Sequence, residues 1–192
     1  HEVGVYTKLS TWEHFKSRTP WILVLAIMGF VSGFIIQSYE GILLQVAILA
    51  SFMPMLTGTG GNAGSQSATL VIRALAVKEI TVKDALKVLV KEFGVAFLMS
   101  LVLATIAYLR VMVFYGNTPT LNHVTPQAVG LAVAIALALQ VIVSTLIGAL
   151  LPLAAVSVKI DPAVVASPLL ATMVDIFGLL IYFNVARLIL HL

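Results

Sequence analysis

Asp175 is the residue whose type and position could most readily do chemistry. It is the only formal charge between Asp161 and Arg187, and it lies 13 residues after Pro162 and 12 before Arg187. In one continuous helix these separations correspond to ~20 Å and ~18 Å, so the carboxylate would lie midway along the segment. Within a membrane, an Asp at this depth costs roughly 2.5–3.5 kcal/mol and normally serves an ion, a proton or a partner. The alternative is a protonated Asp175 that is hydrogen-bonded between helices.

A second group of polar residues lies in segment 58–66, where four glycines occur within seven positions and Asn62 and Ser65 add polar side chains. Gly60 and Gly64 match the G-x-x-x-G spacing, so close helix packing is one interpretation. Because glycines destabilise a helix, we favour non-helical backbone that lines a water-filled cavity. Its carbonyls could then hold the water shell of a cation. A phosphate-binding loop is disfavoured, since the lysine of that motif is missing.

The composition indicates an integral membrane protein. Of the 192 residues 60% are hydrophobic and 10% are charged, which is too apolar for an ordinary soluble domain. The net charge of +3 could suggest nucleic acid, but the basic residues lie beside the ends of apolar segments, which is typical of topology signals. We therefore expect a lipid bilayer, and no nucleic acid, as a partner. The sequence contains no cysteine, which excludes disulfides and thiolate metal sites.

Five apolar segments could cross the membrane as helices, since a ~30 Å hydrocarbon core takes about 20 helical residues. The predicted spans are 20–39, a second within 41–72, then 93–109, 127–158 and 161–186. Prolines open the first and the fifth span, at a first-turn position where the missing N–H is not needed. The fold class is therefore an all-α membrane protein with five transmembrane helices in each subunit.

The second span is predicted to be interrupted. Its 32 uncharged residues would extend roughly 48 Å as one helix, which exceeds the thickness of the bilayer core. Pro54 and the glycines that follow it favour a break at that place. Helix can resume at Ser65 and end at Arg73.

The basic residues predict the orientation in the membrane, because cytoplasmic flanks carry the excess of Lys and Arg. With a cytoplasmic N-terminus and an outer C-terminus, only Arg110 and Arg187 lie at outer ends. The cytoplasmic ends then carry nine of the 11 basic residues, which are Lys8, Lys16, Arg18, Arg73, Lys78, Lys83, Lys87, Lys91 and Lys159. This asymmetry supports five spans and suits a plasma (inner) membrane.

The domain organisation predicted from these segments is simple. Residues 20–192 form one pore domain of five helices. Residues 1–19 precede it, and their aromatic and apolar residues recur every third position between basic ones. This pattern is typical of an amphipathic helix at the membrane interface. The alternative for residues 1–19 is the lead-in of a truncated chain.

Two motifs resemble the bacterial MgtE family of magnesium channels. The first is similar to the family's second membrane helix, and it comprises Pro54, Gly60-Gly61-Asn62-Ala63-Gly64-Ser65-Gln66 and Ile72-Arg73-Ala74-Leu75-Ala76. The second is similar to the fifth helix, and it comprises Asp161-Pro162-Ala163, Ser167-Pro168-Leu169, Ala171-Thr172, Asp175 and Gly178-Leu179-Leu180-Ile181-Tyr182. The motifs occur in the expected order, and the resemblance extends over the chain from Pro20.

The resemblance implies a homodimer with a pore on its two-fold axis, walled by the second and fifth helices of both subunits. Asp175 would be the central Mg2+-binding residue, and the backbone carbonyls of Gly61 and Ala171 would contact the hydrated ion. Asp161 would lie near the cytoplasmic mouth. Further pore-lining positions would be Gly60, Asn62, Ser65, Ser167 and Thr172. The family's cytosolic N-domain and CBS domains are absent from this chain, so the resemblance does not imply Mg2+-dependent gating here.

The function expected from these features is passive, channel-like uptake of hydrated Mg2+, and the chain is not expected to be an enzyme. Mg2+ loses its water reluctantly, so a site in which a few protein oxygens contact the hydrated ion is well suited to it. One alternative is a carrier that exchanges Mg2+ for another cation. A more distant one is an intramembrane aspartyl hydrolase with an Asp175 dyad across the dimer. The sequence leaves open the selectivity among Mg2+, Mn2+, Co2+ and Ca2+.

Overall fold

The computed structural model describes residues 5–118, 123–165 and 168–192, and this part of the chain is helical with short connections. In chain order the elements are η1 Tyr6–Lys8, α1 Thr11–Ser38, α2 Glu40–Gln45, α3 Ile48–Ala76, η2 Val82–Asp84, α4 Ala85–Tyr115, α5 Pro126–Ser157, α6 Pro162–Val165 and α7 Pro168–Leu190.

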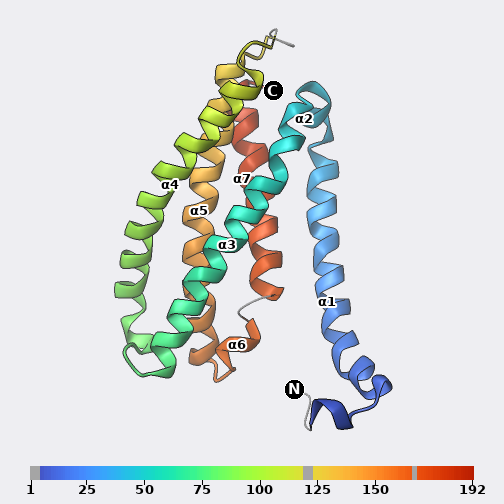
Figure 1. Cartoon of the computed structure of the whole chain (residues 1–192), viewed down its shortest axis with the longest axis vertical. Helices are drawn as coiled ribbons and strands as arrows, with labels where there is room; N and C mark the ends of the chain where they lie inside the picture. Colours follow the sequence, from blue (N-terminus) through green and yellow to red (C-terminus); the bar gives the residue numbers. More distant parts are fainter. Residues whose placement is uncertain (1–4, 119–122, 166–167) are drawn as a thin grey trace.

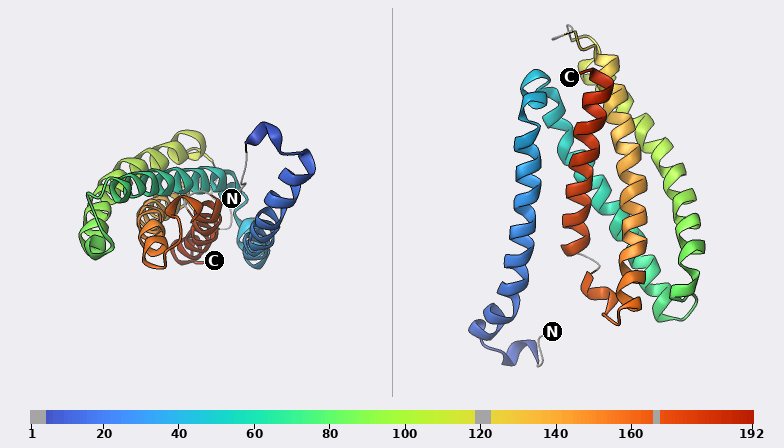
Figure 2. Two further views of the ribbon diagram at one scale, coloured as in Figure 1. Left: turned by 90° about the horizontal axis from the view of Figure 1, so that it is seen from below. Right: turned by 180° about the vertical axis from the view of Figure 1, so that it is seen from behind.

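The long helices alternate in direction along the chain. Helices α1, α4 and α7 run one way and α3 and α5 run the other, so the N- and C-terminal ends lie at opposite ends of the bundle (Figure 1). Helix α5 is the most buried element and packs against α3, α4 and α7. Helix α3 lies across α5 and α7, whereas α1 contacts α7 and diverges from it toward the N-terminus (Figure 2). The core therefore forms where α3, α5 and α7 cross.

Four helical segments are long and apolar enough to cross a membrane, namely Thr11–Ser38, Val82–Tyr115, Pro126–Ser157 and Pro168–Leu190. Large apolar side chains on their outer faces are exposed, as lipid-facing residues would be. On α4 these include Leu98, Leu101, Val102 and Ile106. Helix α3 has 29 residues but is not among the four. Its glycines and polar side chains make it less apolar than the other long helices.

Helix α1 begins earlier than the sequence suggested. The Ser10 hydroxyl accepts the N–H of Glu13, and the Glu13 carboxylate accepts the N–H of Ser10, which forms a capping box. Helix then continues through Pro20 to Ser38. The placement of Pro20 in the first turn was therefore wrong. Residues 11–19 belong to the same helix as the first predicted span.

The predicted break at Pro54 and the glycines was also wrong, because α3 is one helix from Ile48 to Ala76. The interruption lies earlier, at Val46, which has φ −132° and ψ 75° and separates α2 from α3. Pro54 removes one intrahelical donor, and tertiary packing outweighs that loss and the low helix propensity of the glycines. Ending one helix at Val46 also shortens the long apolar run.

Helix α4 extends on both sides of the predicted span 93–109, from Ala85 to Tyr115. Arg110 was taken as the outer limit, but its guanidinium lies over the Phe52 ring of α3, with Cζ 5.2 Å from the centroid. A cation can therefore be held against α3 without ending the helix.

Within the fifth predicted span the structure describes two elements, and residues 166–167 between them lie outside the described residues. Helix α6 spans Pro162–Val165 and α7 begins at Pro168. Proline is well suited to the first turn of a helix. Within α7 as described, Asp175 is seven residues after Pro168, roughly 10 Å along the helix axis.

Candidate cation site

Helices α3, α5 and α7 meet at positions without side chains. A Cβ atom on Gly64 of α3 would lie 3.0 Å from the Ser144 carbonyl oxygen of α5 and 3.5 Å from both Leu170 and Val174 of α7. A Cβ atom on Gly148 of α5 would overlap the backbone of Gly64. The glycine-rich segment of α3 thus lies beside the part of α7 that precedes Asp175.

Asp175 follows the fully buried Val174 and is itself half-buried. Its carboxylate makes no hydrogen bond or ion pair with any residue that the structure describes. Across the described ranges, no three His, Asp or Glu side chains come together to hold a metal ion. The described part of a single copy therefore offers no cage of three or more such ligands around Asp175.

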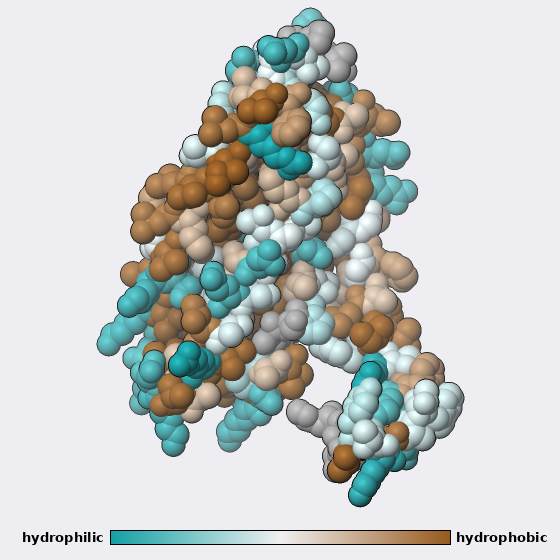
Figure 3. Space-filling view, in the orientation of Figure 1, coloured by the Kyte–Doolittle hydropathy of each residue, from teal (hydrophilic) through white to brown (hydrophobic). Residues whose placement is uncertain are grey.

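The outward face of α3 is polar or small along most of its length. Between Ala50 and Thr69 its exposed residues recur at helical spacing and are polar or small, namely Ala50, Ser51, Pro54, Gly58, Asn62, Ser65, Gln66 and Thr69. Leu70, which is 55% exposed, is the large apolar exception beyond them. In the space-filling view this face forms a pale and teal band that follows α3 diagonally between brown apolar areas (Figure 3). Lipid-facing surfaces are apolar, so this band requires water or a protein partner.

Most of the predicted site residues near Asp175 lie on accessible positions. Gly61 is half-buried and has open space where a side chain would be. Asn62 and Ser65 are exposed on α3, and Ala171 is exposed on α7. Thr172 is half-buried, and its hydroxyl donates to the Pro168 carbonyl at 3.0 Å.

Two of the predicted pore-lining residues, Gly60 and Ser167, are not among these accessible positions. Gly60 is buried against the Gln140 side chain of α5. It therefore serves helix packing, as the G-x-x-x-G interpretation had it, and it does not belong to the outward face. Ser167 lies outside the described residues, so its predicted role stays a prediction.

Asp161 lies away from Asp175, at the end of the bundle where α6 begins. It is exposed, and its Oδ1 accepts the N–H of Ala163 at 2.9 Å. It lines an open cavity of about 790 Å³ together with Lys78 and Lys83 from the connection between α3 and α4. This cavity places one carboxylate and two ammonium groups at the same surface.

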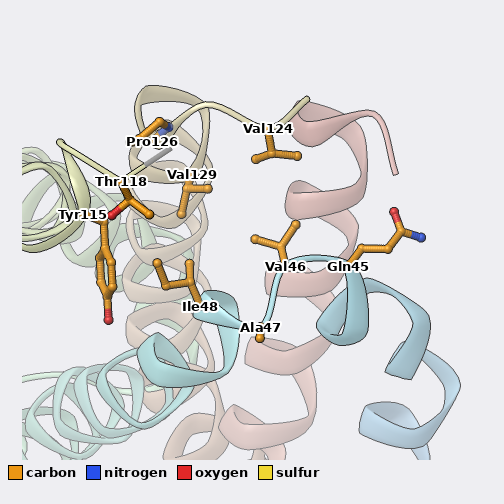
Figure 4. A pocket seen from close by; sticks show the side chains of 9 residues that line it. All are labelled: Gln45, Val46, Ala47, Ile48, Tyr115, Thr118, Val124, Pro126 and Val129. Atoms are coloured by element: carbon orange, nitrogen blue, oxygen red, sulfur yellow. The ribbon is translucent and has the colours of Figure 1, made fainter. Parts of the chain in front are cut away.

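A second cavity, of about 270 Å³, lies at the opposite end of the bundle beside the break at Val46 (Figure 4). Tyr115, Val124 and Val129 are among its lining residues, and none of the described ones carries a charged side chain. Among them it offers a cation only neutral oxygens, and Asp175 is not part of its lining.

Gln140 is the residue of this region that the sequence analysis missed. It is fully buried on α5, and its Nε2 donates to the Val174 carbonyl of α7 at 3.0 Å. Its sequence signal was available, since it is the one amide inside the long apolar segment 128–156. A lone amide in such a segment predicts a hydrogen bond to another helix.

Comparison with known proteins identifies the family of the chain. Residues 53–185 match the model of the MgtE family, which is described as a divalent cation transporter. Proteins named magnesium transporter MgtE are 40% identical in Thermus thermophilus and 35% identical in Bacillus subtilis, over 97% and 91% of this chain. A third, from Enterococcus faecalis, is 31% identical over 92% of the chain. The chain spans 39%, 37% and 37% of these three relatives. The matched residues include most of α3, most of α7 and both predicted motifs, so the chain belongs to the MgtE family.

Proposed function

We propose that this chain forms the membrane-spanning part of a magnesium transporter and conducts Mg2+ through a pore between two copies. The proposal rests on two observations, the polar residues on the outward face of α3 and the half-buried Asp175 on α7, which packs against α3. The family match and the names of the relatives support a transport role over an enzymatic one.

The polar face of α3 favours a second copy as the partner. The Ser51 and Thr69 hydroxyls donate to carbonyls of their own helix, but facing lipid the amides of Asn62 and Gln66 would lack hydrogen-bond partners, at a cost of several kcal/mol for each fully buried group. One copy leaves this face open, since α3 covers the bundle from outside (Figure 1). Two copies that place their α3 helices opposite each other would enclose the polar faces around water. Each copy then contributes one Asp175, so two negative charges meet one divalent ion.

Hydrated Mg2+ fits this arrangement. Mg2+ holds its six waters tightly and is usually bound by one or two carboxylates, with several waters retained. Two Asp175 carboxylates and the carbonyl oxygens of Gly61 and Ala171 would contact the water shell rather than the bare ion. Ala171 lies one turn before Asp175, so the two residues share a helix face.

Helix α3 supplies the fifth crossing of the membrane in this proposal. It runs antiparallel to α1 and α4, the long helices before and after it in the chain, and covers a similar length (Figure 1). A helix that lines a pore is covered by water and protein, and so it can be less apolar than the other four. The distribution of Lys and Arg favours a cytoplasmic N-terminus and an outer C-terminus in the cell membrane.

A membrane potential can drive this transport. At 100 mV, inside negative, the entry of two positive charges gains ~4.6 kcal/mol. The proposal is therefore a passive channel, and a cation-coupled exchanger is the alternative.

Liposomes that contain the chain and a Mg2+-sensitive dye test the proposal. With Mg2+ outside, no Na+ on either side and an imposed negative potential, the dye signal should rise. Asp175→Asn should abolish the rise, whereas Glu40→Gln, which removes an exposed carboxylate at the opposite end, should retain it. If flux requires an opposing Na+ gradient, the protein is an exchanger rather than a channel. Unchanged flux in Asp175→Asn would refute the role of Asp175.

A further inference from the structure

Gln140 links the proposed ion site to the interior of the bundle. Its Nε2 donates to the carbonyl of Val174, the residue before Asp175, at 3.0 Å. In an α-helix the carbonyl of residue i accepts the N–H of residue i+4, which for Val174 is Gly178. The Val174 carbonyl therefore accepts from two donors, and one of them comes from α5.

The carboxamide of Gln140 is held between two glycines on different helices. A Cβ atom on Gly60 of α3 or on Gly178 of α7 would come closer than 3.0 Å to its nitrogen. Any larger residue at either position would displace the carboxamide. One side chain of α5 therefore contacts both helices that carry the proposed site.

Packing alone does not account for a glutamine at this position. Its Oε1 is buried and has no hydrogen-bond partner among the described residues. An unpaired acceptor away from water is unfavourable, whereas an apolar side chain of similar volume would fill the space without that cost. The contribution of the carboxamide is therefore its bond to the Val174 carbonyl.

This bond acts on α7 one residue before the proposed ion ligand, because Asp175 directly follows Val174. Successive side chains on a helix differ in direction by 100°. Holding the Val174 carbonyl toward α5 thus sets the direction in which the Asp175 carboxylate points.

We propose that Gln140 is a positioning residue for Mg2+ binding at Asp175, acting through its hydrogen bond to the Val174 carbonyl. This inference rests on the proposed function of Asp175. Outer groups that orient ion-binding ones typically change metal affinity by about 10- to 100-fold when they are removed.

The test compares Gln140→Met, which keeps the length and volume but not the hydrogen bond, with the control Thr145→Val. Thr145 is also buried on α5, and its hydroxyl has no partner among the described residues. The purified 192-residue chain is melted in detergent after EDTA treatment and then at increasing Mg2+. Gln140→Met should keep the melting temperature measured in EDTA but need about 10-fold more Mg2+ for half of the ion-dependent shift. Thr145→Val should match the wild type in both measurements.

Asp175→Asn separates the two claims. If it leaves the Mg2+ midpoint unchanged, the proposed function fails. If it abolishes the shift while Gln140→Met binds Mg2+ as the wild type does, only the positioning role of Gln140 is overturned. Should Gln140→Met not fold, Gln140→Asn replaces it, since a side chain one carbon shorter keeps the amide but cannot reach the carbonyl. The Mg2+ concentration for half of the ion-dependent shift is then compared between Gln140→Asn and the wild type.

Discussion

The Tyr182 hydroxyl of α7 donates to the Leu49 carbonyl of α3 at 2.5 Å, and both residues are fully buried. The bond joins positions 133 residues apart in sequence. Leu49 lies in the first turn of α3, next to the break that ends α2. The contact therefore fixes where α3 starts relative to the helix that carries Asp175.

Tyr182→Phe should lower the stability of the bundle by about 0.5–1.5 kcal/mol, the usual net contribution of one hydrogen bond. The ring stays, so the apolar packing is kept. The control is Tyr108→Phe, because the Tyr108 hydroxyl makes no hydrogen bond to any described residue while its ring contacts Gly130. Thermal melting in detergent should show a lower transition only for Tyr182→Phe. Equal melting of both variants would contradict the structural role of the Tyr182 bond.

Gly148→Ala should destabilise the crossing of α3 and α5 by about 1–3 kcal/mol, as overpacking does. The added methyl group would overlap the backbone of Gly64, which cannot move without shifting all of α3. Gly94→Ala is the control, since open space surrounds that position. It should melt at the same temperature or higher, because alanine favours the helix over glycine by about 0.5–1 kcal/mol. Melting measurements in which Gly148→Ala equals the wild type would contradict this close approach.

The sequence predicted much of the architecture, since apolar length and charge placement are local properties. Four of the five predicted spans correspond to helices long and apolar enough to cross a membrane. The break in the second span was misplaced because helix propensity was weighed without packing partners. Gly60 and Gly64 are favourable in a helix here, since Gln140 and Ser144 of α5 occupy the space that side chains would fill.

The candidate site was only partly predictable for a related reason. Asp175 stands out from sequence because a lone charge in an apolar segment is costly wherever it lies. The role of Gln140 depends instead on the distance to a carbonyl 34 residues later. The Gln140 side chain points toward Val174 because of how α5 and α7 cross, and this crossing cannot be predicted from a local sequence pattern.

The outward face of α3 should be lined by water in the assembled protein. The chain has no cysteine, so single cysteines can be introduced without a background. Asn62→Cys on that face should react with a hydrophilic, charged thiol reagent, since the reactive thiolate forms in water. Leu98→Cys is the control, because Leu98 is 65% exposed but lies on the apolar face of α4.

In membranes, Leu98→Cys should resist the same reagent, and Mg2+ should slow the modification of Asn62→Cys. Labelling is measured by mass spectrometry after a timed reaction. Equal resistance of the two cysteines would mean that α3 faces lipid or a dry interface, which removes the main support for a pore.

Asp161→Asn should slow Mg2+ uptake at low ionic strength without abolishing it. The exposed carboxylate lies beside Lys78 and Lys83, and its loss leaves those two positive charges to repel cations from the cavity. Asparagine still has an oxygen for the Ala163 N–H, so the turn before α6 is preserved. Interactions between exposed charges are screened over a Debye length, which is ≈ 10 Å at 0.1 M salt and 3 Å at 1 M. The difference from the wild type in liposome flux should therefore shrink as KCl is raised. A loss of uptake that persists in high salt would mean that Asp161 contacts the ion directly rather than acting through the local potential.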